Sequence, residues 1–400
     1  MSTFARLRFL DAGESHGPKL TAIVEGCPAG FPIDPKRIDV ELARRQRGFG
    51  SGGRMSIEHD RARMTAGVTA GRTTGGPIAI EVKNRDFENW REKDIPPMTT
   101  PRPGHADLTG AIKYGHRDLR KSLERASARE TTMRVAVGAI LKQMLGEFGV
   151  EIGGYVLSIG DAQAGLAQNP GPDEYIRRFA ASMNNDLACP DDTAAEKMRG
   201  AIEEAKKQKD TLGGVFEIVV LNAPPGLGSY THWDRRFEAR LAMAMTSIQA
   251  VKGVEFGAAF ENATRPGTEV HDEIYLEGED NLVRKTNRSG GIEGGITTGA
   301  PIVIRAAMKP ISTTLTPLKS VNLATFEPGE TVYERSDICA VPRAVPVGEA
   351  MAALVLADAL FEKLGGDSLE EMRPRFEKLC RGSLGEFVLD NAPWRFGYDG

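Results

Sequence analysis

Three stretches of the chain place apolar residues at every third or fourth position, the spacing that buries one face of a helix. The first stretch contains Leu119, Leu123, Ala126, Met133, Val137, Ile140 and Met144. The second contains Phe237, Leu241, Ala244, Ile248 and Val251. Gly253 is placed to end this second helix, and the third stretch, residues 347–364, ends at a pair of glycines. The pattern therefore predicts three long core helices.

Shorter elements are predicted around these helices. Residues 6–12 and 20–25 are typical of two strands on either side of a Gly-rich turn. Residues 39–47 predict a short helix that ends in the Gly-rich run 48–53. Residues 193–209 are rich in lysine and glutamate, which predicts a helix on the solvated surface. The chain thus combines strands with helices.

One fourteen-residue pattern occurs twice. Residues 67–80 and 291–304 are identical at eight of fourteen positions, and each is a Gly-rich turn followed by Thr-Thr-Gly-x-Pro and an apolar strand. Gly-Pro turn chemistry makes unrelated hairpins look alike, but we favour two related halves. Because no Pro/Ser-rich linker divides them, we predict a single domain over residues 1–365 and a C-terminal tail over residues 366–400.

Composition and charge narrow the classes of function. The chain of 400 residues is 40% hydrophobic and 26% charged, which is typical of a globular protein. Its net charge of −4 gives no general sign of a nucleic-acid partner. The longest apolar run, residues 351–360, is broken by Asp358 and is too short for a membrane span, and the N-terminus lacks a signal peptide. We therefore predict a cytoplasmic protein without a nucleic-acid or membrane partner.

The pattern of cysteines and histidines gives no metal site. The four cysteines are too far apart for a CxxC pair, and none of the six histidines has a second histidine at helical ligand spacing. No metal is therefore expected.

Three generic motifs occur, and each fails its structural requirement. Residues 13–17 fit the G-x-S-x-G nucleophile elbow, but a strand follows them where the elbow needs a helix. Residues 48–53 fit the dinucleotide fingerprint, but they follow a helix and not a strand. Residues 116–119 imitate a kinase catalytic loop without the required Asn or a DFG motif. Hydrolase, Rossmann and kinase interpretations are rejected.

Two histidines and many arginines remain as candidate chemistry. His16 and His105 each lie in a glycine-bounded turn, where an imidazole can exchange protons with a ligand, although each could simply bond its own turn. Eight arginines crowd into residues 37–72 beside the Gly-rich run. Arginine binds carboxylates and phosphates bidentately, although such a cluster can also be a solvated face. The combination indicates a polyanionic ligand.

These segments resemble the successive signatures of the chorismate synthase family. The resemblance is carried in order by residues 13–17 (GESHG), 44–46 (RRQ), 52–55 (GGRM), 102–107 (RPGHAD), 124–131 (ERASARET), 247–253 (SIQAVKG), 309–313 (KPIST) and 335–342 (RSDICAVP). So many collinear matches, from about Gly13 to Gly366, make the resemblance specific.

The resemblance implies a fold and a reaction. The implied fold is α+β, a β-α-β sandwich of antiparallel sheets around long helices. The implied reaction is the anti 1,4-elimination of phosphate from 5-enolpyruvylshikimate 3-phosphate, which gives chorismate for aromatic amino acid biosynthesis. It requires reduced FMN without net redox change. The family is also homotetrameric. Whether NADPH reduces the flavin on the protein itself, or a separate flavin reductase supplies it, stays open.

The resemblance also assigns roles to residues. His16 is similar to the histidine that protonates the departing phosphate, and His105 to the one that keeps the reduced flavin in its working protonation state. Asp337 is similar to the acid that assists deprotonation at flavin N5, relayed through Ser15 or Ser127. The substrate clamp is carried over to Arg45, Arg54, Arg102, Arg129 and Arg335. The FMN-binding positions are Arg125, Ala126, Ser127, Gln249, Ala250, Gly294, Lys309, Pro310, Ile311, Ser312, Thr313 and Arg335.

The sequence departs from the family pattern in the Gly-rich run. Ser51 stands where close family members have an arginine, and Arg47 stands where they often have glycine. We expect Arg47 to replace the missing charge in the substrate site.

Two other functions compete with this interpretation. An FMN-dependent oxidoreductase on a small anionic substrate would also need a flavin and arginines, but would consume reduced flavin as product forms. A non-catalytic anion- or RNA-binding module would explain the arginines alone. It would give no role to His16 or His105, and the net charge of −4 argues against it.

Overall fold

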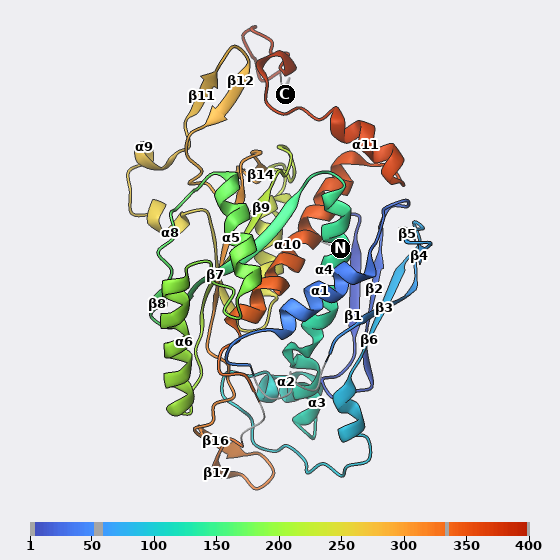
Figure 1. Cartoon of the computed structure of the whole chain (residues 1–400), viewed down its shortest axis with the longest axis vertical. Helices are drawn as coiled ribbons and strands as arrows, with labels where there is room; N and C mark the ends of the chain where they lie inside the picture. The colour runs from blue at the N-terminus through green and yellow to red at the C-terminus, as the bar shows by residue number, and fades with distance from the viewer. Residues whose placement is uncertain (1–4, 52–58, 333–335, 398–400) are drawn as a thin grey trace.

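The computed structural model describes residues 5–51, 59–332 and 336–397. Two antiparallel sheets lie on either side of a layer of helices (Figure 1). One sheet has the order β1 (Arg8–Ala12), β2 (Lys19–Glu25), β6 (Ile78–Lys83), β3 (Ala62–Ala66). The other has the order β10 (Val251–Phe256), β15 (Ile302–Met308), β9 (Gly214–Leu221), β7 (Glu151–Ile159), β8 (Ala162–Gln163). The predicted α+β sandwich is confirmed.

Three helices form most of the central layer. They are α1 (Pro35–Gln46), α4 (Thr131–Gly146) and α10 (Val341–Leu364). Helix α4 packs against β2 and β6, and α10 packs against β7 and β9. Because α4 and α10 also pack against each other, they connect the two sheets. Smaller helices cover the outer side of the five-stranded sheet, among them α5 (Pro172–Asn184) and α6 (Asp192–Lys207).

Helix α10 is the central element of the core. It is long and apolar enough to cross a membrane by length and composition, but its apolar window is entirely buried inside the protein. Its buried Glu349 is paired with Arg44 at 2.7 Å and with Lys142 at 2.6 Å. Its buried Asp358 accepts hydrogen bonds from three successive N-terminal backbone N–H groups and from Arg240. These charges are tolerated in the core because each has partners.

The predicted helices exist, but their bounds differ from the prediction. The first predicted helix is broken at Ser127 into α3 (Arg120–Ala126), the 3₁₀ turn η3 (Ala128–Glu130) and α4. Ser127 is extended, and its hydroxyl accepts the N–H of Arg129, which caps the new turn. Apolar spacing could not reveal this break, because the residues on both sides of it are core.

The other differences have similar causes. Helix α7 (Phe237–Thr246) ends before Gly253 because the chain turns at Ala250, with φ of 66°, into strand β10. Helix α10 begins at Val341, six residues earlier than predicted, with Pro342 in its first turn. Helix α6 is solvated on one face only, since Met198 and Ile202 on its other face are buried.

The repeated pattern forms the same structure twice. The first copy contains the hairpin of β4 (Val68–Thr69) and β5 (Arg72–Thr73) and leads into β6; the second contains β13 (Ile292–Glu293) and β14 (Ile296–Thr297) and leads into β15. In the first, the Thr73 hydroxyl donates to the Pro28 carbonyl at 2.6 Å. In the second, the Thr297 hydroxyl donates to the Pro224 carbonyl at 2.7 Å. Both hairpins thus have the same internal anchor, as related halves require.

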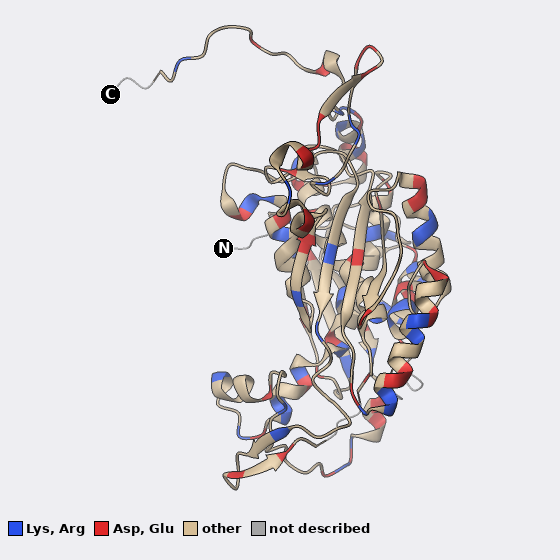
Figure 2. Cartoon of the chain, turned by 90° about the vertical axis from the view of Figure 1, so that its left-hand side faces the viewer, with Lys and Arg blue, Asp and Glu red and all other residues tan. Residues whose placement is uncertain are grey.

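The C-terminal segment does not separate at residue 365. Helix α11 (Leu369–Glu377) buries Leu369 and Met372 in the main core, and the Leu369 N–H donates to the Ala29 carbonyl at 2.9 Å. The compact body therefore includes α11. Only the chain beyond it extends away from the body (Figure 2).

The contact between α4 and α10 gives a stability prediction. A Cβ added at Gly138 would lie 2.2 Å from the Ala350 Cβ. Gly138→Ala should therefore lower the free energy of unfolding by roughly 1–3 kcal/mol, because the helices must separate. Gly146→Ala, at the end of the same helix, meets nothing within 4 Å and should be neutral or slightly stabilising. Urea denaturation compares the two, and equal stabilities would contradict the prediction.

Candidate functional site

A cavity of about 1040 Å³ opens at one end of the sandwich. The β1–β2 turn, α3 with η3, the loops at 102–106 and 309–313 and the start of α10 converge on it. Many of the predicted site residues line it: Ser15, His16, Arg45, Arg102, His105, Ala126, Ser127, Arg129, Gln249, Ala250, Lys309, Ile311, Ser312, Thr313 and Asp337. Segments that are far apart in the sequence are thus brought to one place.

Other predicted residues lie elsewhere. Arg125 is half exposed and paired with Asp11 at 3.0 Å, and Pro310 is not among the lining residues. Gly294 lies in the β13–β14 turn, next to the end of β15 that is remote from the cavity. The 7 residues of β15 span roughly 20 Å at the usual rise per strand residue, so Gly294 is about that far from the cavity. Arg54 and Arg335 lie outside the described residues.

Arg47 is not placed as expected. Its guanidinium donates to the Met183 carbonyl at 3.2 Å, and neither Arg47 nor Ser51 lines the cavity. The hypothesis that Arg47 supplies a missing charge to the site is therefore wrong. The chain turns outward after α1, since Arg47 is the extended residue that ends this helix.

His105 belongs to a rigid ionic group on the cavity wall. Its Nδ1 lies 2.6 Å from the buried Asp107, which also pairs with Arg102 at 2.8 Å. Arg102 donates in addition to the Thr313 hydroxyl at 2.9 Å. Burial alone would raise the pKa of Asp107, but the bonds from His105 and Arg102 hold it well below its usual range. The guanidinium of Arg102 is thus used mainly in bonds that hold the 102–107 and 309–313 segments together. His105 remains at the cavity surface, where it can contact a ligand.

His16 is held by a residue that the sequence analysis did not single out. Its Nδ1 lies 2.7 Å from Glu124 Oε1, and its backbone N–H donates to Oε2 of the same carboxylate at 2.8 Å. The ring of Trp90 lies 4.3 Å from the imidazole, centre to centre. Nearby, the hydroxyls of Ser15 and Ser127 are 3.2 Å apart, so a proton can pass between these two predicted relay residues.

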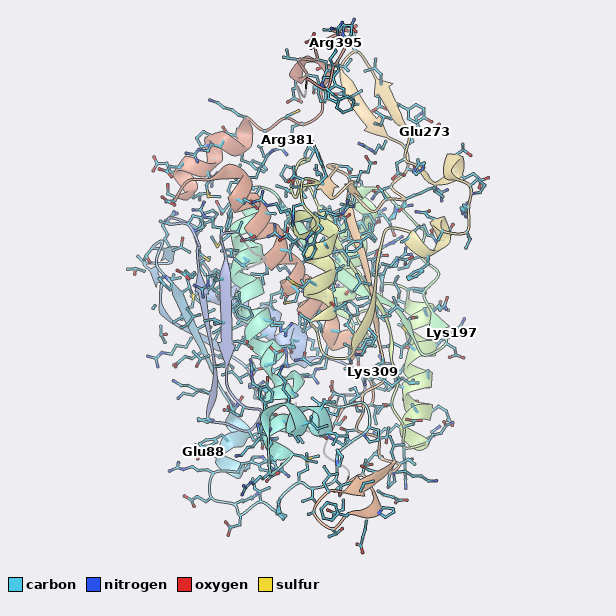
Figure 3. The ribbon with its side chains drawn as sticks, turned by 180° about the vertical axis from the view of Figure 1, so that it is seen from behind. Glu88, Lys197, Glu273, Lys309, Arg381 and Arg395 are labelled. Carbon is cyan, nitrogen blue, oxygen red and sulfur yellow. The ribbon has the colours of Figure 1, made fainter. Side chains whose placement is uncertain are left out.

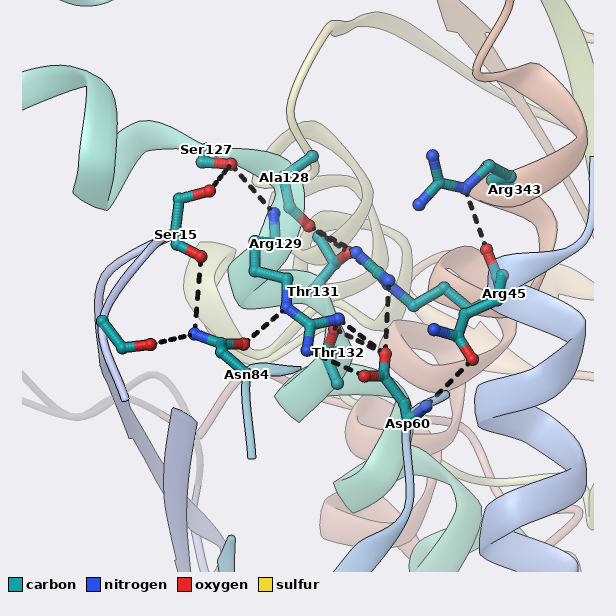
Figure 4. A network of polar contacts seen from close by, with 12 residues as sticks. Ser15, Arg45, Asp60, Asn84, Ser127, Ala128, Arg129, Thr131, Thr132 and Arg343 are labelled. Carbon is teal, nitrogen blue, oxygen red and sulfur yellow. Dashed lines mark hydrogen bonds and ion pairs between the residues drawn. The ribbon is translucent and has the colours of Figure 1, made fainter. Parts of the chain in front are cut away.

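Buried arginines form the deepest part of the site (Figure 4). Arg129 makes a bidentate pair with Asp60, both bonds at 2.7 Å, and donates to Asn84 at 2.8 Å. Arg45 donates to the Thr131 hydroxyl and the Ala128 carbonyl, but its buried Nη1 is 3.9 Å from Asp60 and has no hydrogen-bond partner in the described part of the chain. Arg129 is thus occupied within the protein, whereas Arg45 keeps a donor for a ligand.

The charge of Arg45 is only partly compensated. Burial and the neighbouring guanidinium of Arg343 lower the pKa of Arg45 to about 9, against the weaker opposite effect of Asp60. Arg343 itself lines the cavity, pairs with Asp337 and donates to the Arg45 carbonyl at 2.9 Å. The sequence analysis missed Arg343, which lies in the first turn of α10, ahead of the residues from which this helix was predicted. A cation just before an apolar periodic stretch was the available signal.

A second cationic position lies at the end of β15. Lys309, labelled in Figure 3, donates to the Ser312 hydroxyl at 3.2 Å, and Ser312 donates to the Gly104 carbonyl at 2.8 Å. Burial and the like charge of Lys252 lower the pKa of Lys309. Gln249 also lines the cavity, and among the described residues its buried Oε1 has no hydrogen-bond partner. A phosphate at Lys309 and a ring N–H at Gln249 would satisfy these groups, so the residues present fit FMN.

The cavity as a whole can therefore bind two anions and move protons. Its volume exceeds that of a typical small-ligand pocket, which leaves space for a cofactor and a substrate together. Among the described residues, no cluster of three His, Cys, Asp or Glu side chains could hold a metal ion.

Arg45 should dominate anion binding. Arg45→Gln should weaken binding of inorganic phosphate by about tenfold or more, the effect of losing one charged hydrogen bond. The measurement is the increase in melting temperature with phosphate. Arg8→Gln, which removes an exposed arginine on β1, is the control and should keep the increase. An equal loss in both variants would contradict the prediction.

Arg47 should not matter for ligand binding. Because its side chain contacts Met183 and not the cavity, Arg47→Ala should change the phosphate effect by less than about twofold, as is usual for surface substitutions. The same melting experiment tests this, and a loss as large as that of Arg45→Gln would show that Arg47 reaches the ligand.

Comparison with known proteins shows the family of this chain. The sequence model of the chorismate synthase family matches residues 7–361. Chorismate synthase from Trichlorobacter lovleyi is 53% identical over 392 residues, covering 94% of this chain and 99% of that protein. The enzyme from Aquifex aeolicus is 52% identical over 384 residues, covering 93% and 96%. A crystal structure of a chorismate synthase, 46% identical, superposes with a TM-score of 0.78 over 94% of this chain and 97% of that one. The chain belongs to the chorismate synthase family.

Proposed function

We propose that this chain eliminates phosphate from 5-enolpyruvylshikimate 3-phosphate, anti and 1,4, to give chorismate. The observation that carries the proposal is the under-compensated Arg45 at the base of a cavity that two carboxylate-held histidines also face. A trianionic substrate would satisfy this charge, and the histidines supply the proton transfers that an elimination needs.

Reduced FMN would be held by Lys309, Ser312 and Thr313 together with Gln249 and Ala250, whose segment is bonded to theirs by the Lys309 N–H, which donates to the Ala250 carbonyl at 2.9 Å. When bound, the flavin would supply the transient electron density that the elimination needs, without net oxidation or reduction. The protein's part is to hold the flavin and the substrate against each other and to keep water out. Burial of Arg45, which is 3% exposed, supports such exclusion at the base of the site.

Each histidine is hydrogen-bonded through Nδ1 to a carboxylate, which suits a role in proton transfer. His16 would donate a proton from Nε2 to an oxygen of the departing phosphate, while Glu124 holds its Nδ1. His105, whose Nδ1 is held by Asp107, would exchange a proton with the flavin through its other ring nitrogen. Asp337, paired with Arg343, would accept the proton released near the flavin, with Ser15 and Ser127 as the relay. The arginines stabilise the negative charge that develops on the phosphate.

The electron source and the assembly are also proposals. We propose that NADPH or a separate reductase supplies the electrons, that the protein is cytoplasmic, and that four copies assemble. The position of Gly294 supports assembly: if this residue contacts FMN, it must do so in the cavity of another copy, because its own cavity is at the far end of β15. Light scattering should then give four times 43.3 kDa.

The reaction is tested without oxygen. The protein, FMN reduced with dithionite and the phosphorylated substrate are mixed, and phosphate release and chorismate absorbance are followed. We expect one phosphate for each chorismate and a flavin that stays reduced. Flavin oxidised in proportion to product would indicate an oxidoreductase instead. Absence of phosphate release would refute the proposed function. A parallel reaction with NADPH and oxidised FMN tests whether the chain reduces its own flavin.

A further inference from the structure

His16 is fixed from two sides by residues that have no assigned role. Glu124 of α3 binds both the backbone N–H of His16 and its ring Nδ1, at 2.8 and 2.7 Å. Trp90 covers the ring at a centroid distance of 4.3 Å. The side chains of His16 and Glu124 are only 17% and 14% exposed. A histidine that simply capped its own turn would not need either neighbour.

The carboxylate determines which ring nitrogen carries the proton. An ionised carboxylate only accepts hydrogen bonds, so Nδ1 of His16 must be the N–H donor to Glu124. Nε2 is then the nitrogen that gives or takes a proton at the cavity. Burial would raise the pKa of Glu124, but the hydrogen bonds and charge of His16 lower it overall. Glu124 therefore stays ionised and holds a ring proton of His16 on Nδ1.

Trp90 fixes the plane of the ring. Its indole N–H donates to the buried Asp86 at 3.2 Å, and Asp86 also accepts from Asn89 at 2.9 Å. Arg120 lies 6.0 Å from the Trp90 ring and contributes to lowering the pKa of Glu124. Among the described residues, the charged groups near His16 include Glu124 and Arg120 from α3 and Asp86 beneath the indole. Rotation of the imidazole away from the cavity would lose both the Glu124 bond and the Trp90 contact.

We propose that Glu124 is a positioning residue that keeps the Nδ1 proton of His16 in place and directs Nε2 at the cavity, with Trp90 holding the ring plane. This inference rests on the proposed function. In each turnover the Nε2 proton moves to an oxygen of the departing phosphate, and the neutral imidazole keeps its Nδ1–H on Glu124. Solvent returns the proton before the next substrate binds. In catalytic triads, likewise, a carboxylate orients a histidine and does not itself transfer the proton.

Glu124→Gln separates this role from a structural one. The amide oxygen can still accept the His16 backbone N–H, so a purely structural Glu124 predicts nearly normal activity. The amide NH₂, however, would face Nδ1 as a donor and disfavour the imidazolium. We expect kcat to fall about 10- to 100-fold, within the range of general acid catalysis, with KM and FMN affinity little changed. The alkaline limb of the pH profile should move to lower pH by about one unit.

Three further variants complete the test. Glu124→Asp should restore part of kcat and return the alkaline limb toward that of the wild type. Trp90→Leu should lower kcat without moving the limb, because it alters packing and not charge. Glu88→Gln, on the same segment as Trp90 but 70% exposed and paired only at 3.5 Å with Arg91, is the charge control and should behave like the wild type.

The outcomes are distinguishable. A wild type that releases no phosphate defeats the proposed function. An active wild type with unchanged kcat and pH profile in Glu124→Gln overturns the inference alone. If Glu124→Gln melts early, ¹⁵N NMR of histidine-labelled wild type decides: the neutral His16 ring must be protonated at Nδ1, and protonation at Nε2 instead overturns the proposal.

Discussion

The site depends on an imbalance of buried charge. In the core between the helices, two cations and two carboxylates are matched: Arg44 and Lys142 share Glu41 and Glu349. Burial would raise the pKa of Glu349, but these two cations lower it to about 2, as expected for a carboxylate stable in its charged form. At the base of the cavity, Arg45 instead lies beside two further guanidiniums, and no described residue accepts a hydrogen bond from its Nη1. The first cluster holds helices together, whereas the second lowers its free energy when an anion arrives.

The scaffold around this imbalance is built from two similar halves. Each half contributes a threonine-anchored hairpin and a following strand, so the sheets are rigid on both sides of the helices. The reactive residues come from the turns and loops at one end, where side chains are not needed for the core. Such placement lets the cavity contain His16 from one half and Lys309 from the other on a fixed frame.

Much of the fold was predictable from the sequence because it depends on local spacing. Apolar periodicity predicted α4, α7 and α10, and the repeated pattern predicted two similar halves. Partner choice was not predictable. Arg129 was expected to bind substrate, yet Asp60, sixty-nine residues away, accepts two of its hydrogen bonds. Pairing over that separation depends on how the sheet packs against the helices, which spacing along the chain does not encode.

Two partners of the site were missed for a related reason. Glu124 stands at the start of a recognised segment but has no chemistry of its own until the β1–β2 turn brings His16 to it. Arg343 stands in an apolar stretch and acquires its role only beside Asp337 and Arg45. Residues whose function is to orient another residue carry little signal in a single sequence.

The break at Ser127 explains why these partners can act separately. In a continuous helix, residues 124 and 128 would lie on the same face, one turn apart. The Ala128 carbonyl of such a helix would point along its axis and accept the Thr132 N–H, so it would not face the Arg45 guanidinium. The extended Ser127 instead ends α3 and starts a new turn, so that Glu124 binds His16 while the Ala128 carbonyl accepts from Arg45 at 2.7 Å. The break at Ser127 thus lets Glu124 serve His16 and the Ala128 carbonyl serve Arg45 independently. It also interrupts the regular helix that the apolar pattern predicts.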